Sequence, residues 1–137
     1  PKPQNPMKQI LIKTNKNILD INFAKMVTQF TDTSAFTTAF DEQATTGNKF
    51  IAIFTGSINE ETNESWCPDC VEAKPSIQRI VDGCGGNRVI LKGIVTRDEW
   101  RGNEAHAYRQ APYGAQGVPT VVLFEGTNAL HKVDDLA

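Results

Sequence analysis

Two cysteines, Cys67 and Cys70, lie between an apolar run and a helical pattern, and this arrangement constrains the fold more than any other feature of the sequence. Residues 50–54 are all apolar, which is typical of a strand covered on both faces. After Cys70, apolar side chains recur at helical spacing until Gly83, where a helix is expected to end. We therefore predict a redox-active pair of thiols at the start of a helix.

The composition is that of an ordinary globular domain. The chain has 137 residues, enough for one domain, with 39% hydrophobic and 22% charged residues and a net charge of -2. That charge argues against a nucleic-acid-binding surface, and no apolar run approaches the roughly 20 residues that span a bilayer. The N-terminus has no signal-peptide pattern, and three cysteines are an odd count for a secreted disulfide scaffold. We expect a cytoplasmic monomer that binds neither nucleic acid nor membranes.

Hydrophobic periodicity predicts alternating strands and helices. Strands are expected at residues 25–30, 49–54, 88–95, 118–124 and 129–133. Helices are expected between residues 32–34 and 47, between 70 and 83, and at 103–110, the last with Asn103 as its cap and with Ala105, Ala107 and Tyr108 packed inside. This order predicts an α/β domain over residues 25–137, with helices flanking a mixed sheet. Residues 1–24 are expected to be an N-terminal extension that is partly unstructured.

Further details carry a resemblance to a known fold. Trp66 directly precedes the first cysteine, Pro75 follows in the predicted helix, and residues 118–120, Val-Pro-Thr, lead into an apolar strand. In these details the chain resembles thioredoxins. Residues 54–57 (Phe-Thr-Gly-Ser), the long loop after them and residues 66–70 (Trp-Cys-Pro-Asp-Cys) resemble the thioredoxin domain-containing protein 17 family more specifically.

The resemblance implies a thioredoxin-like fold without its usual C-terminal helix, because this chain stops at Ala137. One face of the sheet would then be short of cover. We expect the N-terminal extension to cover part of that face through apolar residues 10–12 or 18–23.

A thiol attacks a disulfide only as its thiolate. The start of a helix favours that form of Cys67, because unpaired N–H groups and the positive end of the helix dipole lie there. Pro68 suits the first helical position, where its missing N–H costs least. Cys70 follows one turn later and is expected to be the more buried thiol. We predict that Cys67 attacks a substrate disulfide and that Cys70 then displaces the reduced substrate.

The resemblance also implies a reductant and a substrate groove. Electrons are expected from NADPH through thioredoxin reductase, a partner protein, with no cofactor bound. A cis peptide bond is expected before Pro119, and the substrate, a protein or a small-molecule disulfide, is expected to contact Val118. The predicted catalytic residues are Cys67, Cys70 and Asp69, the predicted substrate-binding residues are Trp66, Pro68, Val118 and Pro119, and no metal site is expected.

Asp69 is the unusual member of this set. Its negative charge is expected to raise the pKa of Cys67, and its carboxylate can accept a proton from Cys70. In thioredoxin a buried aspartate has the second task, and the resemblance places the apolar Ile53 at that position. Residues 57–65, with three glutamates, and residues 98–101 are expected to form an acidic rim around the thiols, unless the charges are simply solvated.

The remaining candidate residues favour packing or turns. Half of a zinc site would need two more ligands, and Cys84, His106 and His131 show no suitable pairing. The glycine-rich stretch 82–86 follows a helix and fits no nucleotide-binding motif, and Trp100 is expected to pack. Two functions remain open: a protein-disulfide reductase, and a thioredoxin-fold adaptor whose dithiol senses oxidation without turning over.

Overall fold

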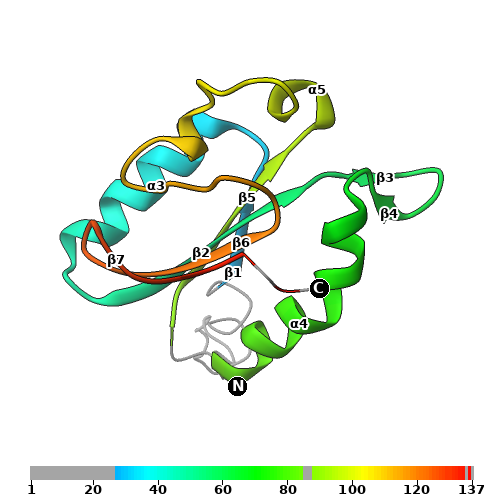
Figure 1. The fold of residues 1–137 in the computed structure, drawn as a ribbon. Coiled ribbons are helices and arrows are strands. Elements are labelled where there is room, and N and C mark those ends of the chain that lie inside the picture. The colour runs from blue at the N-terminus through cyan, green and yellow to red at the C-terminus, as the bar shows by residue number, and fades with distance from the viewer. Residues whose placement is uncertain (1–26, 85–87, 135, 137) are drawn as a thin grey trace, which may run out of the picture.

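The computed structural model describes residues 27–84, 88–134 and 136. Within them, five strands form one mixed sheet in the order β1-β5-β2-β6-β7 (Figure 1). The parallel strands are β1 (Val27–Phe30), β5 (Ile90–Val95) and β2 (Lys49–Gly56), and the antiparallel ones are β6 (Thr120–Glu125) and β7 (Asn128–Val133). The predicted mixed sheet with flanking helices is confirmed. The N-terminal extension, and the cover expected from it, lie outside the described residues.

The apolar run in β2 is buried on both faces, as predicted. Phe50, Ala52 and Phe54 belong to one hydrophobic cluster, whereas Ile51 and Ile53 belong to a second. Successive side chains of a strand point to opposite faces, so this central strand supplies both cores.

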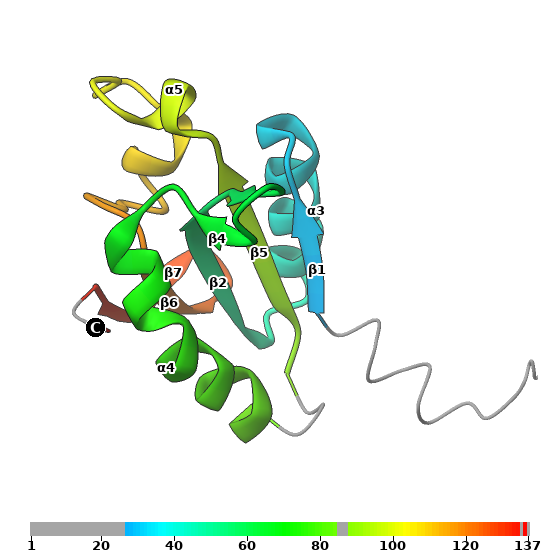
Figure 2. The ribbon, with the colours of Figure 1, turned by 90° about the vertical axis from the view of Figure 1, so that its right-hand side faces the viewer.

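Two helices cover the two faces of the sheet (Figure 2). On one face lies α3 (Thr33–Thr45), whose cap residue Asp32 accepts a hydrogen bond from the backbone N–H of Ser34 at 3.4 Å. Gly47, with φ of 74°, turns the chain from α3 into β2. On the other face lies α4 (Pro68–Cys84), which continues through Pro75. None of the helices in the described part of the chain is long and apolar enough to cross a membrane.

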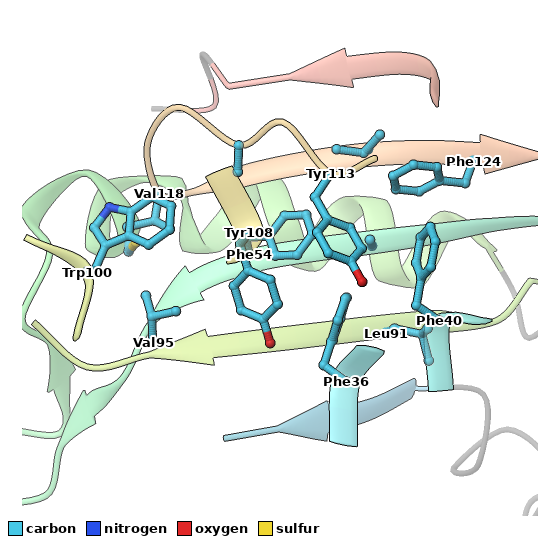
Figure 3. Close-up of a cluster of buried hydrophobic side chains, with 14 of the residues drawn as sticks. Phe36, Phe40, Phe54, Leu91, Val95, Trp100, Tyr108, Tyr113, Val118 and Phe124 are labelled. Carbon is cyan, nitrogen blue, oxygen red and sulfur yellow. The ribbon is translucent and has the colours of Figure 1, made fainter. Parts of the chain in front are cut away.

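The cluster under α3 is built largely from aromatic rings (Figure 3). Phe36 and Phe40 of α3 meet Tyr113 with ring centroids 5.6 and 4.9 Å apart. The ring centroids of Tyr108 and Phe54 of β2 are 4.8 Å apart. Both tyrosines come from the segment between β5 and β6, which therefore closes this core beside the helix.

That segment differs from the prediction. The expected helix at residues 103–110 is wrong: a short helix α5 (Arg97–Trp100) precedes it, and only a 3-10 turn η2 (Ala107–Arg109) forms inside it. Asn103 does not cap a long helix, because its side-chain oxygen accepts the N–H of Ala105 two residues later in a local turn. Tyr108 packs as expected, but Ala105 and Ala107 are exposed and His106 is buried.

The loop expected at residues 57–65 contains a small hairpin. Its strands are β3 (Ile58–Asn59) and β4 (Glu64–Ser65), which pair antiparallel. The hairpin projects from the end of β2 and returns the chain to the start of α4 (Figure 1). It therefore fixes the entry of the chain into the two cysteines.

Candidate functional site

Cys67 and Cys70 lie at the beginning of α4, as predicted. Cys67 directly precedes the helix, and Pro68 is its first residue. The backbone N–H of Cys70 donates to Sγ of Cys67 at an N–S distance of 3.4 Å, so the Cys67 side chain caps the first turn. Both cysteines are free thiols in the structure.

Backbone groups from two other elements contact the sulfur atoms. The thiol of Cys67 donates to the carbonyl oxygen of Val118 at 3.4 Å. The N–H of Gly56, at the end of β2, donates to Sγ of Cys70 at 3.4 Å. The peptide bond between Val118 and Pro119 is cis. The end of β2 and the segment before β6 thus meet at the dithiol.

Trp66 and Ser65 connect the dithiol to the sheet. The indole N–H of Trp66 donates to the carbonyl oxygen of Val95 at 3.0 Å. The hydroxyl of Ser65 accepts the N–H of Cys67 at 3.2 Å and donates to the carbonyl oxygen of Gly56 at 3.2 Å. These contacts fix the backbone on the N-terminal side of the helix.

Gly56 and Ser65 were missed as site residues by the sequence reasoning. A Cβ atom at Gly56 would lie 2.9 Å from both Ser65 Oγ and the Trp66 ring, so only glycine leaves room for them. The sequence does contain one indication of this role, since a glycine stands at the end of the apolar strand, just before the loop that leads to the cysteines.

The pKa of Cys67 differs from the expectation. Burial and, to a smaller extent, the neighbouring thiol of Cys70 raise the pKa of Cys67 to about 11. The backbone N–H groups of Cys70 and Asp69 lower it, which is the effect expected at a helix start, but burial outweighs them. Both thiols are buried, with exposed fractions of 6% for Cys67 and 5% for Cys70, so Cys70 is the more buried of the two by a small margin only.

Asp69 lies on the side of the dithiol that faces Val118. Its side chain is exposed and lines a cavity of about 370 Å³ together with Val118, Pro119 and Asp134. Burial and Cys70 raise the pKa of Cys67, and the additional effect expected of the Asp69 charge stays a prediction. Three predicted site residues, Asp69, Val118 and Pro119, thus share one hollow next to the thiols.

Both predicted flanking segments reach Trp66. A hollow of about 220 Å³ is lined by Trp66, residues 57–59 and residues 96–98. Glu60 and Glu61 are exposed and do not line it, whereas the exposed Asp98 does, beside Arg97.

The other candidate residues have packing roles. Trp100 is buried, as predicted, and His106 packs against it with ring centroids 5.3 Å apart. Cys84 ends α4 and packs at the edge of the second cluster, whereas His131 is exposed on β7. Within the described ranges, no three His, Cys, Asp or Glu side chains come together as metal ligands would.

Comparison with solved structures agrees with this architecture. Thioredoxin NaTrxh from Nicotiana alata superimposes with a TM-score of 0.53 at 16% sequence identity, covering 80% of this chain and 80% of that one. A mixed sheet between two helix layers, with a pair of thiols at the start of the helix after the central strand, defines the class of thioredoxin-fold proteins.

Sequence comparison is more specific. Residues 27–135 match the family described as thioredoxin domain-containing protein 17-like, thioredoxin domain, and the chain belongs to this family. The thioredoxin-like protein Clot of Arabidopsis thaliana is 30% identical over 97 residues, which cover 69% of this chain and 71% of that protein. An acireductone dioxygenase of Leishmania infantum is 38% identical over 92 residues, but these cover only 27% of that protein and 61% of this chain.

Proposed function

We propose that this chain is a cytoplasmic thiol-disulfide oxidoreductase that reduces protein or small-molecule disulfides with Cys67 and Cys70. The observation that carries the proposal is the contact between the Cys70 N–H and Sγ of Cys67, which holds two free thiols one helical turn apart. Family membership supports a thioredoxin-type redox role in general. Thioredoxin reductase, with electrons from NADPH, is the proposed recycling partner.

In the proposed reaction, the thiolate of Cys67 attacks one sulfur of the substrate disulfide. A mixed disulfide forms, and the other substrate sulfur leaves as a thiolate that takes up a proton. Cys70, after losing its own proton, attacks Sγ of Cys67 and releases the second substrate thiol. Two electrons and two protons have then passed to the substrate, and thioredoxin reductase returns both by reducing the Cys67–Cys70 bridge.

The hollow beside Asp69 is the proposed substrate groove. Val118 and Pro119 form one wall of it, and Trp66 and Pro68, which flank Cys67 in the chain, are proposed to contact the substrate as well. Asp69 is proposed to accept the proton of Cys70 through solvent, since it is exposed on the same turn of α4. A substrate backbone that reaches Val118 would lie against the carbonyl group that now accepts the thiol of Cys67.

The test is NADPH consumption in the presence of thioredoxin reductase and a small disulfide such as cystine. The unaltered chain and the Cys84→Ser variant should turn over many times, whereas Cys67→Ser should be inactive. Cys70→Ser should retain the first step and accumulate mixed disulfides, which mass spectrometry detects. Full turnover by Cys67→Ser, or loss of turnover in Cys84→Ser alone, would contradict the proposed roles.

A second candidate is a redox-sensing adaptor, because two free thiols one helical turn apart can close into a bridge in a single oxidation. The raised pKa of Cys67 slows attack on disulfides and oxidation alike, so it does not distinguish the two candidates. A sensor needs to be oxidised only once per signal. In the same assay, NADPH consumption that stops after one equivalent of protein would favour the sensor over the reductase.

A further inference from the structure

A second cavity lies behind Cys70, away from Val118. Its volume is about 700 Å³, and it is bounded by α4, by β1 and β5, and by the β3–β4 hairpin. This size falls in the range of small-molecule sites in proteins, roughly 300–1,000 Å³. The mechanism proposed above does not use this space, except that Cys70 forms part of its wall.

Two lysines from different elements face this cavity. Lys74 comes from α4 and Lys92 from β5, and both line it. The one ion pair among the described residues joins His106 to Glu99 and involves neither lysine. The titratable side chains that share the wall with them are Glu64 and Cys70, so positive charge prevails.

Lys92 is partly buried and lines the same cavity as Lys74. Burial lowers the pKa of Lys92, and the positive charge of Lys74 lowers it further. A half-buried ammonium beside a like charge is unfavourable, and an anion placed between the two would relieve both the burial cost and the repulsion.

The remaining wall combines apolar and hydroxyl side chains. Val71, Ile77, Val81 and Ile94 supply apolar surface, and Thr55 and Ser57 supply hydroxyl groups. Ile58, at the edge, is 55% exposed and adds apolar surface that no described residue covers. The amides of Gln29, Asn63 and Gln78 line the cavity as well, so apolar surface lies beside groups that can orient an organic ligand through hydrogen bonds.

We propose that this cavity binds a small organic anion, whose carboxylate or phosphate group lies between Lys74 and Lys92 and whose apolar part rests on α4 and β5. The proposal does not depend on the redox function, because binding alone reveals it. An occupant would lie against Cys70, on the opposite side from the groove at Val118.

The test is isothermal titration of the reduced full chain with phenyl phosphate, hexanoate and the neutral hexanamide. Binding of phenyl phosphate alone would identify a phosphate site, and binding of hexanoate alone a carboxylate site. Lys92→Met and Lys74→Gln should each weaken binding at least about tenfold, since each removes a charged hydrogen-bond donor. Lys49→Gln, which removes an exposed lysine at the start of β2, is the matched control and should have no effect.

An independent readout is the pKa of Lys92, followed by NMR of methylated lysines. Ligand binding should raise this pKa, because a negative charge replaces solvent beside the ammonium group. The proposal is overturned if neither anion binds, if hexanamide binds as tightly as hexanoate, or if Lys49→Gln weakens binding as much as Lys92→Met. Lys74 is exposed on α4, so Lys74→Gln is expected to fold even if Lys92→Met does not.

Discussion

Substitution of Gly56 by alanine should disturb the dithiol without touching either cysteine. The added Cβ would lie 2.9 Å from Ser65 Oγ and from two atoms of the Trp66 ring, closer than real Cβ atoms approach their neighbours. Overpacking of this kind costs about 1–3 kcal/mol, and each hydrogen bond lost adds about 1 kcal/mol. Displacing both side chains endangers the bond from Trp66 to Val95 and the two bonds made by the Ser65 hydroxyl.

We therefore expect Gly56→Ala to lower the free energy of unfolding by about 2–4 kcal/mol, the overpacking cost plus the loss of one of these three hydrogen bonds. The Trp66 indole N–H resonance should shift, and disulfide reduction should slow by about tenfold. Urea unfolding, NMR and the NADPH assay measure these three effects.

Gly83→Ala is the matched control. Nothing lies within 4 Å of a Cβ atom at Gly83, which is exposed near the end of α4. Alanine is the better helix former there, so this substitution should be neutral or stabilise by up to about 1 kcal/mol. The steric argument fails if Gly56→Ala is no more destabilising than Gly83→Ala, or if the Trp66 resonance stays in place.

Contacts elsewhere and the raised pKa of Cys67 lead to further expected outcomes. Arg109 donates to three backbone carbonyl oxygens at 2.8–3.1 Å and lies 3.8 Å from the Trp100 ring centroid, so Arg109→Ala should lower the urea midpoint by the equivalent of about 2–3 kcal/mol. Arg109→Lys should recover little of this, because an ammonium lacks the planar fork. Gly93→Ala would place a Cβ 2.9 Å from the Tyr108 ring and should cost about 1–3 kcal/mol with a loss of near-ultraviolet circular dichroism. The rate of Cys67 alkylation, measured by mass spectrometry, should still increase between pH 9 and 10, because the pKa of Cys67 is raised to about 11. The alkylation rate of an ordinary thiol, with a pKa of about 8.5, levels off in that range. Because the pKa of Cys67 is higher in the folded chain than in the unfolded chain, the unfolded chain loses the thiol proton at a lower pH. The contribution of Cys67 to the free energy of unfolding should therefore fall as the pH rises above about 9.

Local sequence patterns predicted those parts of the fold whose structure is determined by residues close to one another along the chain. The apolar run in β2 supplies both cores, and Phe36 and Phe40 recur at helical spacing on the buried face of α3. The segment between β5 and β6 could not be predicted in this way. His106 is buried there because Tyr108 donates its N–H to the His106 ring and Trp100 packs against it. A local helical pattern cannot report such contacts.

The positions of the two thiols were predictable, but their ionisation was not. A cysteine before a helix has the same backbone donors in any fold, and these donors do lower the pKa of Cys67. The opposing burial depends on the segment that ends in Val118, 51 residues away along the chain. The role of Gly56 has the same origin, since its small size matters only because Trp66 folds back over it.

These opposing effects bear on different steps of the proposed reaction. Attack on a substrate requires the thiolate of Cys67, and burial raises the free energy of that form. Closure of the bridge requires that Sγ of Cys70 reach Sγ of Cys67, and the 3.4 Å contact from the Cys70 backbone N–H to Sγ of Cys67 keeps the two residues one helical turn apart. Groups held in contact react as if at very high local concentration. Burial therefore hinders the first attack, whereas the helical turn keeps the second cysteine near for closure, and single-turnover and multiple-turnover measurements test the two steps separately.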